Sequence, residues 1–233
     1  MKQDMILYHG SQQIVETPIY GKGRIHNDYG RGFYCTEDKE MAKEWACSVR
    51  NDGYCNKYVL HLDSLNVMHL TKGSYNILNW LAILLQKRRF DIISAIGKEA
   101  RDFIISRFLP DLSDVDVVTG YRADDSYFSF AEDFVNNSIS LRELNRAMQL
   151  GKLGEQVVLL SERAFEQIEF KGYEIADYRE YYYRRLERDR KAKSDYLNQK
   201  RIPGLLRDDL FILDIIREDM KNDDKRLQSV ISR

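Results

Sequence analysis

The sequence has few cysteines, no long apolar run and almost no net charge. Its three cysteines, Cys35, Cys47 and Cys55, have neither metal-site spacing nor the even number of a disulfide framework, so we expect reduced thiols in a cytoplasmic protein. No stretch of about 18 apolar residues occurs, so we expect no membrane-spanning helix. The opening MKQDMILYHGS holds no apolar segment of signal-peptide length. A formal net charge of -1 argues against a general electrostatic attraction to nucleic acid.

The chain is long enough for a sizeable domain, and its sequence predicts both strands and helices. Its 233 residues suffice for one large domain or for a domain with an appendage. Apolar or alternating runs predict strands over residues 5–9, 57–62, 115–120 and 157–160, and helical spacing predicts a helical insertion over about 75–109. Ser140, with Glu143 three positions on, predicts a capping box at the start of a further helix.

The most informative stretch is NDYGRGFYCTEDKEMAKEWA, residues 27–46. It opens with a turn containing Gly30 and Gly32, continues through a short aromatic strand and runs into a helix. Thr36 is the expected N-cap of that helix, which carries Trp45 at helical spacing from its other apolar residues. Because glycines before a tyrosine let the backbone approach a partner closely, this stretch predicts a ligand platform.

A second motif lies upstream, in ILYHGS, residues 6–11, where an apolar strand ends in a histidine and a Gly-Ser turn. HGS followed by GRGFYCTEDKEMAKEWA resembles the NAD-binding core of the poly-ADP-ribose-polymerase-like, or diphtheria-toxin-like, ADP-ribosyltransferases. The resemblance is closest to a bacterial family, largely uncharacterised, that is grouped with these transferases. It implies an α+β fold of split mixed β-sheets with helical insertions.

The resemblance also implies NAD as the ADP-ribose donor and assigns roles to individual residues. His9 would hydrogen-bond a ribose of NAD, the Gly10 backbone would hold the nicotinamide amide, and Ser11 is a weaker candidate for that amide. Tyr34 would stack on nicotinamide, and Trp45 would add a second aromatic surface, although an aromatic in a helix is ordinarily core. The expected NAD-binding set is Tyr8, His9, Gly10, Ser11, Gly32, Tyr34, Trp45, Arg122 and Asp124, and the expected catalytic set is His9, Tyr34 and Gln156, with no metal ligand.

The chain departs from that pattern in LGEQVVLLSERAF, residues 153–165. Gln156 stands where the family has a glutamate, and Glu155 precedes it. Consecutive strand residues face opposite ways, so only one of the two can point into the site. A glutamine can hydrogen-bond a ribose 2′-hydroxyl but brings no charge. If Gln156 points into the site, elongation of an ADP-ribose polymer is disfavoured. The remaining possibilities are transfer of a single ADP-ribose, hydrolysis of NAD, or loss of catalysis.

A polar run over residues 121–127 has two interpretations. It can be a loop in which Asp124 or Asp125 caps the next helix. It can also line the site, with Arg122 and these aspartates supplying the missing charge or holding a phosphate.

Beyond Tyr173 a tyrosine cluster over 178–183 and a basic run over 184–201 indicate a helical C-terminal extension. We therefore expect an ADP-ribosyltransferase-like domain over 1–172 and this extension over 173–233. The first hypothesis is an NAD-dependent mono-ADP-ribosyltransferase that modifies a protein or nucleic-acid target, with a protein favoured, as a bacterial toxin or effector that can have a cognate inhibitor.

Two other hypotheses remain open. The first is a catalytically inactive module that binds NAD or a partner protein, which Gln156 favours. The second is nucleic-acid binding by the tyrosine cluster and the basic run, because aromatics interleaved with Arg and Lys can stack on bases and track phosphates. The nucleic-acid hypothesis is weakened because most runs of charged residues are simply the solvent-exposed faces of helices.

Overall fold

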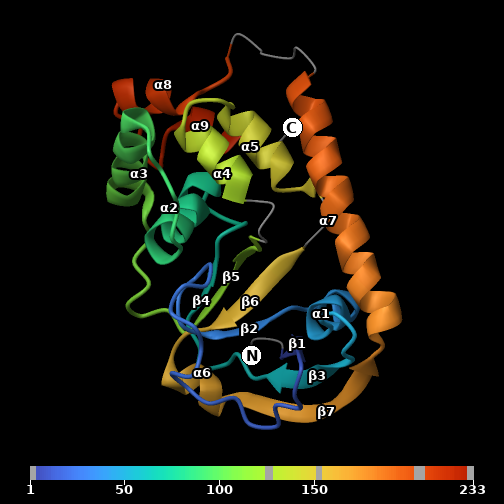
Figure 1. Cartoon of the computed structure of the whole chain (residues 1–233). Coiled ribbons are helices and arrows are strands. Elements are labelled where there is room, and N and C mark those ends of the chain that lie inside the picture. Colours follow the sequence, from blue (N-terminus) through green and yellow to red (C-terminus); the bar gives the residue numbers. More distant parts are fainter. Residues whose placement is uncertain (1–3, 124–127, 151–153, 202–207, 230–233) are drawn as a thin grey trace.

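Two open β-sheets and several helices form an α+β fold in the computed structural model (Figure 1). The structure describes residues 4–123, 128–150, 154–201 and 208–229. The first sheet has the order β1-β3-β7 and is antiparallel throughout, with β1 at Met5–Ser11, β3 at Gly53–Leu60 and β7 at Ile168–Ala176.

The second sheet has the order β2-β6-β5-β4 and is mixed, because β4 and β5 are parallel while the other pairs are antiparallel. Its strands are β2 (Phe33–Cys35), β4 (Val67–His69), β5 (Val117–Tyr121) and β6 (Glu155–Leu159). A buried cluster with members from both sheets, including Leu7, Tyr58, Val117 and Leu159, holds the sheets together. In Figure 1 the second sheet lies between the first sheet and most of the helices.

The larger buried cluster belongs to the helices, which include α2 (Ile77–Lys87), α3 (Ala95–Phe108), α4 (Phe128–Val135) and α5 (Leu141–Ala147). The capping box expected at Ser140 is confirmed, because its hydroxyl accepts from the Glu143 N–H and the Glu143 carboxylate accepts from the Ser140 N–H. No helix in the described part of the chain is both long and apolar enough to cross a bilayer.

The C-terminal part is helical and packs onto the rest of the chain. It comprises α7 (Tyr178–Arg201), α8 (Ile212–Arg217) and α9 (Lys225–Ser229), and the short α6 (Glu162–Glu166) precedes β7. The expected division between residues 172 and 173 falls inside β7. Ile212, Ile215 and Met220 belong to the same buried cluster as α2–α5.

Helix α1 (Lys39–Ala46) begins two residues later than the sequence predicts. Its N-cap is Asp38, whose carboxylate accepts from the Glu40 and Met41 N–H groups, so the prediction of Thr36 as the cap is wrong. Thr36 instead exchanges two backbone hydrogen bonds with Tyr8, of 2.8 and 2.9 Å. This bridge joins the edge of β1 to the chain that follows β2.

Candidate functional site

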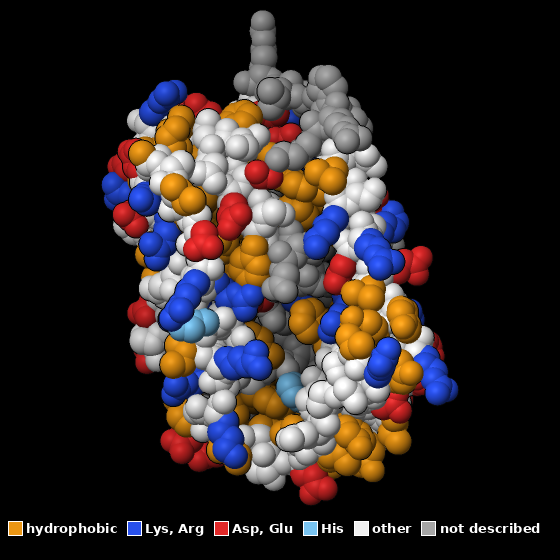
Figure 2. Space-filling view, in the orientation of Figure 1, with side chains coloured by type: hydrophobic (Ala, Val, Ile, Leu, Met, Phe, Trp, Pro, Cys, Tyr) orange, Lys and Arg blue, Asp and Glu red, His pale blue; other side chains and the backbone are white. Residues whose placement is uncertain are grey.

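A cleft of about 1110 Å³ lies where β1, the glycine turn before β2, α1, the adjoining ends of β5 and β6, and α7 meet. The expected site residues that line it are Tyr8, His9, Gly10, Ser11, Gly32, Tyr34, Trp45, Arg122 and Gln156. Asp124 and Asp125 lie outside the described residues. Figure 2 shows a hollow in this face of the molecule with Lys and Arg side chains on both sides of it. The cleft is slightly larger than the range typical of small-molecule sites.

The His9 imidazole is held in one orientation at the floor of the cleft. Its Nδ1 lies 2.7 Å from the backbone oxygen of Tyr34, and its ring packs on Phe33 with centroids 4.5 Å apart. A carbonyl only accepts, so Nδ1 carries the proton and Nε2 is the acceptor. Burial lowers the pKa of His9, partly opposed by the Tyr34 hydrogen bond, so the ring is neutral at neutral pH.

Gly10 offers backbone rather than a side chain to the cleft. Tyr8 directs both its N–H and its C=O to Thr36, on the side of β1 opposite β3. Backbone groups of alternate residues in an antiparallel strand point to the same edge, so Gly10 presents its N–H and C=O on that side too. A donor and an acceptor side by side match a primary carboxamide, which has both.

Tyr34 presents its ring while its hydroxyl is used to hold the glycine turn. The hydroxyl donates to the Gly30 carbonyl at 2.6 Å and accepts from the Tyr29 N–H at 3.1 Å. Gly30 has φ of 80°, a left-handed conformation that favours glycine. Burial raises the pKa of Tyr34 well above its ordinary value, so the phenol does not ionise at neutral pH. The phenol therefore serves to hold the glycine turn and not as an acid or a base.

Trp45 and Arg122 reach the cleft as a stacked pair. The Arg122 guanidinium lies 4.5 Å from the centroid of the Trp45 ring, and Arg122 is only 8% exposed. One face of the indole is thus covered. Its Nε1–H is buried and has no hydrogen-bond partner in the described part of the chain.

Gln156, and not Glu155, faces the cleft. Gln156 is 3% exposed, and its Nε2 donates to the Asp28 carboxylate at 3.0 Å and to the Tyr121 carbonyl at 3.1 Å. Glu155 is exposed on the other side of β6, where it accepts a hydrogen bond of 2.6 Å from the Thr71 hydroxyl. The alternation of strand side chains therefore puts the neutral residue inside.

Asp28 is a site residue that the sequence analysis missed. It lines the cleft with only 6% of its surface exposed, accepts from the Ala123 N–H at 3.0 Å, and lies 3.8 Å from Arg88 Nε. Burial raises the pKa of Asp28, whereas the hydrogen bonds from Gln156 and Ala123 and the charges of Arg88 and Arg122 lower it, with a net upward shift. The only signal in the sequence is its position just before Tyr29-Gly30 in the platform stretch.

The raised pKa of Asp28 predicts how its replacement changes stability. A carboxyl with a raised folded-state pKa favours folding below its unfolded pKa, and this contribution is lost as pH rises through the folded pKa. We therefore expect Asp28→Asn to be at least as stable as the wild type at pH 7, with the difference shrinking toward pH 4. Thermal unfolding of both proteins between these pH values measures it, and a variant that is less stable at pH 7 than at pH 4, relative to wild type, would contradict the expectation.

Six basic side chains line the cleft: Lys22, Arg24, Arg88, Arg122, Arg185 and Lys193. The last two come from α7, which also places Asp189 there. Other parts of the basic run pair within the chain, because Arg184 contacts Glu40 at 3.0 Å and Arg188 contacts Glu44 at 2.6 Å. Part of the run thus docks α7 onto α1, and part faces the cleft.

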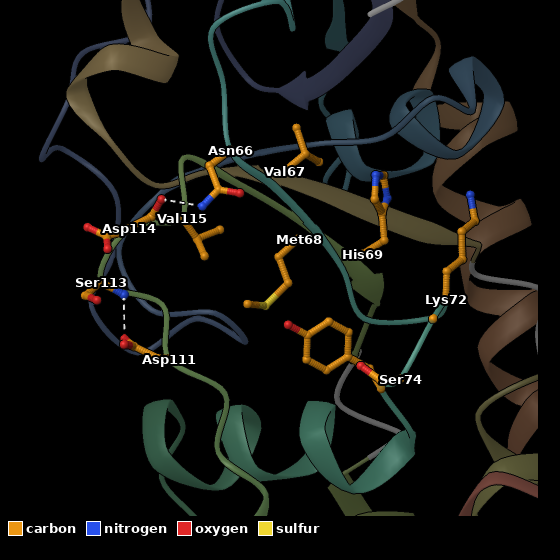
Figure 3. Close-up of a pocket in the computed structure, with 12 residues that line it drawn as sticks. Asn66, Val67, Met68, His69, Lys72, Ser74, Asp111, Ser113, Asp114 and Val115 are labelled. Carbon is orange, nitrogen blue, oxygen red and sulfur yellow. Dashed lines mark hydrogen bonds between the residues drawn. The ribbon is translucent and has the colours of Figure 1, made fainter. Parts of the chain in front are cut away.

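A second depression, of about 540 Å³, lies beside β4 and the segment before β5 (Figure 3). Met68 points into it, whereas His69 and Lys72 point away from Met68 (Figure 3). Nδ1 of His69 lies 2.8 Å from the Thr119 hydroxyl, a contact that fixes the ring to the neighbouring strand. No group of three or more His, Cys, Asp or Glu side chains among the described residues is arranged to hold a metal ion.

Comparison with known families gives one match. The model of a family described as Protein of unknown function (DUF3990) matches residues 5–170. The comparisons with curated proteins and with solved structures find no match. The matched range holds His9, Asp28, Tyr34 and Gln156, whereas α7 lies beyond it.

Proposed function

We propose, from the premise that this chain belongs to the DUF3990 family of proteins of unknown function, that it binds NAD in the cleft and acts as a mono-ADP-ribosyltransferase. The observation that carries the proposal is that His9, Tyr34 and Gln156 come from three different strands and line one cleft. The motif resemblance assigns NAD contacts to these positions, and the fold we propose is the split-sheet fold of the ADP-ribosyltransferases.

The proposed pose places nicotinamide between the Gly10 backbone and the Tyr34 ring. The N–H and C=O of Gly10 would bind the carboxamide, and the tyrosine would stack on the pyridinium. Nε2 of His9 would accept a hydrogen bond from a ribose hydroxyl, which a neutral imidazole with Nδ1 protonated can do. The basic side chains that line the cleft, including Arg24 and Arg88, would offset the two negative charges of the pyrophosphate.

The reaction needs few chemical groups from the protein. The bond between nicotinamide and ribose C1′ breaks, and its electron pair goes to the pyridinium nitrogen, so nicotinamide leaves neutral. The cationic C1′ is captured by an acceptor nucleophile or by water, which loses a proton to solvent. Preorganised dipoles around the sugar lower the barrier because they need no rearrangement as the charge develops. Gln156, next to the ribose, would be one such dipole.

A protein is the acceptor class that we propose. Ion pairs such as Arg184 with Glu40 and Arg188 with Glu44 occupy part of the basic run that a nucleic acid would otherwise use. The three buried cysteines are free thiols, which supports action in a reducing compartment, the cytoplasm. A toxin or effector role, with a cognate inhibitor, follows from the resemblance alone.

Trp45 provides the test of NAD binding. The chain has two tryptophans, and Trp80 is 1% exposed in the helical core, so a ligand that enters the cleft should change mainly the fluorescence of Trp45. We expect NAD to quench the emission of the purified full chain, and Trp45→Phe to remove most of the quenching. Release of labelled nicotinamide, measured in parallel, separates a transferase or hydrolase from a module that only binds NAD.

Tyr34→Ala tests the stacking contact. Loss of an aromatic platform costs about 1–3 kcal/mol per base-like ring, so we expect the Kd for NAD to rise between about fivefold and 150-fold. Tyr34→Phe keeps the ring and should change the Kd by less than about threefold. Tyr173→Ala, which removes a half-exposed tyrosine of β7 away from the cleft, is the matched control. Wild-type protein that neither binds NAD nor releases nicotinamide would refute the proposed function.

A further inference from the structure

The cleft contains a buried carboxylate that the motif resemblance does not provide for. Position 156 carries a neutral amide where the transferases that the motifs resemble have a glutamate, yet the Asp28 carboxylate lies 3.0 Å from the Nε2 of that amide, and both residues line the cleft. Asp28 comes from the loop before the glycine turn, and Gln156 comes from β6. Two segments far apart in the sequence thus build an amide and carboxylate pair that occupies the place of one acidic side chain.

The orientation of the amide follows from its partners. The Asp28 carboxylate and the Tyr121 carbonyl can only accept hydrogen bonds, so both contacts identify Nε2 as the nitrogen and use both of its hydrogens. The oxygen Oε1 is then the atom of Gln156 left for a ligand, and no donor to it occurs in the described part of the chain. A hydrogen bond from an amide N–H to an ionised carboxylate draws electron density toward the amide oxygen, which makes Oε1 a stronger acceptor.

We propose that Asp28 is a positioning residue that supplies, through Gln156, the negative charge for cleavage of the nicotinamide-ribose bond. This inference rests on the proposed function. Gln156 is the residue that touches the substrate, with Oε1 accepting a hydrogen bond from the ribose 2′-hydroxyl. Asp28 fixes the amide in that orientation and adds its charge through the hydrogen bond to Nε2.

The step balances without proton transfer to either side chain. The C1′–N bond breaks, its electron pair leaves with nicotinamide, and positive charge grows on the ribose. The charge of Asp28 offsets that growth and strengthens the hydrogen bond between Oε1 and the 2′-hydroxyl. The acceptor nucleophile then forms its bond to C1′ and releases its proton to water, while Asp28 stays ionised throughout.

Three partners of Asp28 favour its ionised form, against the burial that raises its pKa. Arg88 at the end of α2 lies 3.8 Å from one carboxylate oxygen, and the other oxygen accepts from Ala123 N–H as well as from Gln156. A structural ion pair with Arg88 alone would not require the Gln156 amide to donate to the same carboxylate. The hydrogen bond between the two side chains transmits the effect of the charge to one orientable dipole.

Three variants of the full chain test the proposal: Asp28→Asn, Gln156→Glu and the double variant Asp28→Asn/Gln156→Glu. Loss of one preorganised electrostatic contact typically lowers kcat by about 10²–10³, and we expect that loss of nicotinamide release in Asp28→Asn. The Kd for NAD should change by less than about threefold. Glu155→Gln is the matched control, because it removes a charge one residue away on the opposite side of β6 and should leave the release rate unchanged.

The double variant exchanges the amide and the carboxylate and so returns the charge to the pair. We expect it to release nicotinamide at least tenfold faster than Asp28→Asn. Recovery should be partial, because the Tyr121 carbonyl loses the donor that Gln156 provides. In Gln156→Glu alone two carboxyl groups face each other, so one is protonated, and the pH profile of release should shift to higher pH relative to wild type.

The outcomes separate this inference from the proposed function. If wild type releases nicotinamide and Asp28→Asn does so at the same rate, Asp28 has no part in the reaction and the transferase proposal stands. If Asp28→Asn and the double variant are equally slow, the role of Asp28 is only structural and the inference is overturned. If wild type binds NAD without releasing nicotinamide, both the transfer activity and this inference are overturned, and absence of NAD binding removes the proposed function as a whole.

Discussion

Gly10→Ala should destabilise the protein by about 3 kcal/mol or more, near or beyond the upper end of what overpacking usually costs. A β-carbon at this position would lie 2.0 Å from the backbone oxygen of Ala42 and 2.7 Å from the backbone nitrogen of Ala46. Both atoms belong to α1, so no side-chain rotation relieves the collision, and strand and helix must separate. For a chain of this size the loss corresponds to a fall in Tm of about 6–12 °C, which thermal unfolding by circular dichroism measures.

Gly21→Ala is the matched control for this prediction. Gly21 has φ of 81°, and a β-carbon there would meet nothing within 4 Å. The added methyl should cost only about 1 kcal/mol, from the left-handed backbone. If Gly10→Ala and Gly21→Ala lower the stability equally, the close approach of β1 and α1 does not explain why position 10 is a glycine. The proposed contact of the Gly10 backbone with a ligand would then be the remaining explanation.

His9→Ala should weaken NAD binding tenfold or more. A buried ribose hydroxyl that loses its acceptor costs about 1–3 kcal/mol, and the substitution also leaves the Tyr34 carbonyl without its donor. The measurement is titration of Trp45 fluorescence with NAD. His61→Ala is the control, because His61 contacts Asp4 and Glu169 at the surface, away from the cleft.

The same histidine predicts the pH dependence of binding. Because burial lowers the pKa of His9 below 6.5, its Nε2 stays an acceptor as pH falls through that value. Any loss of NAD affinity on acidification should therefore be centred below pH 6.5, where a protonated Nε2 can no longer accept the hydrogen bond from the ribose hydroxyl. A drop in affinity centred near pH 6.5 would contradict a buried, neutral imidazole.

Local patterns in the sequence predict most elements of this fold because they act over a few residues. The capping box of Ser140 with Glu143 is an example, since both partners belong to one helical turn. The N-cap of α1 is a counterexample. Thr36 has the right residue type, but its backbone pairs with Tyr8, and the helix begins after Asp38 instead. A pairing between distant strands decided this point, and no local pattern records it.

The site shows the same division between local and long-range information. The motifs pointed to His9 and Tyr34 because each lies inside a recognisable strand and turn. Asp28 could not be predicted as a site residue, because it is identified by its hydrogen bond with Gln156, which is 128 positions away in the sequence. The two side chains meet only because β6 lies between β2 and β5 in the second sheet. Gln156 rather than Glu155 points into the cleft because of the register between β5 and β6. The sequence of the strand does not fix this register, and a shift of one residue would turn Glu155 inward instead.

Helix α7 gives the cleft a wall that lies outside the range matched by the family model. The residues proposed to act in bond cleavage all precede residue 160, whereas Arg185, Asp189 and Lys193 reach the cleft from a helix near the end of the chain. Under the proposed function, substitutions at these three positions of α7 would change which macromolecule docks beside the cleft and would leave the contacts proposed for NAD intact. The choice of target and the cleavage of the bond would then depend on separate segments of the chain.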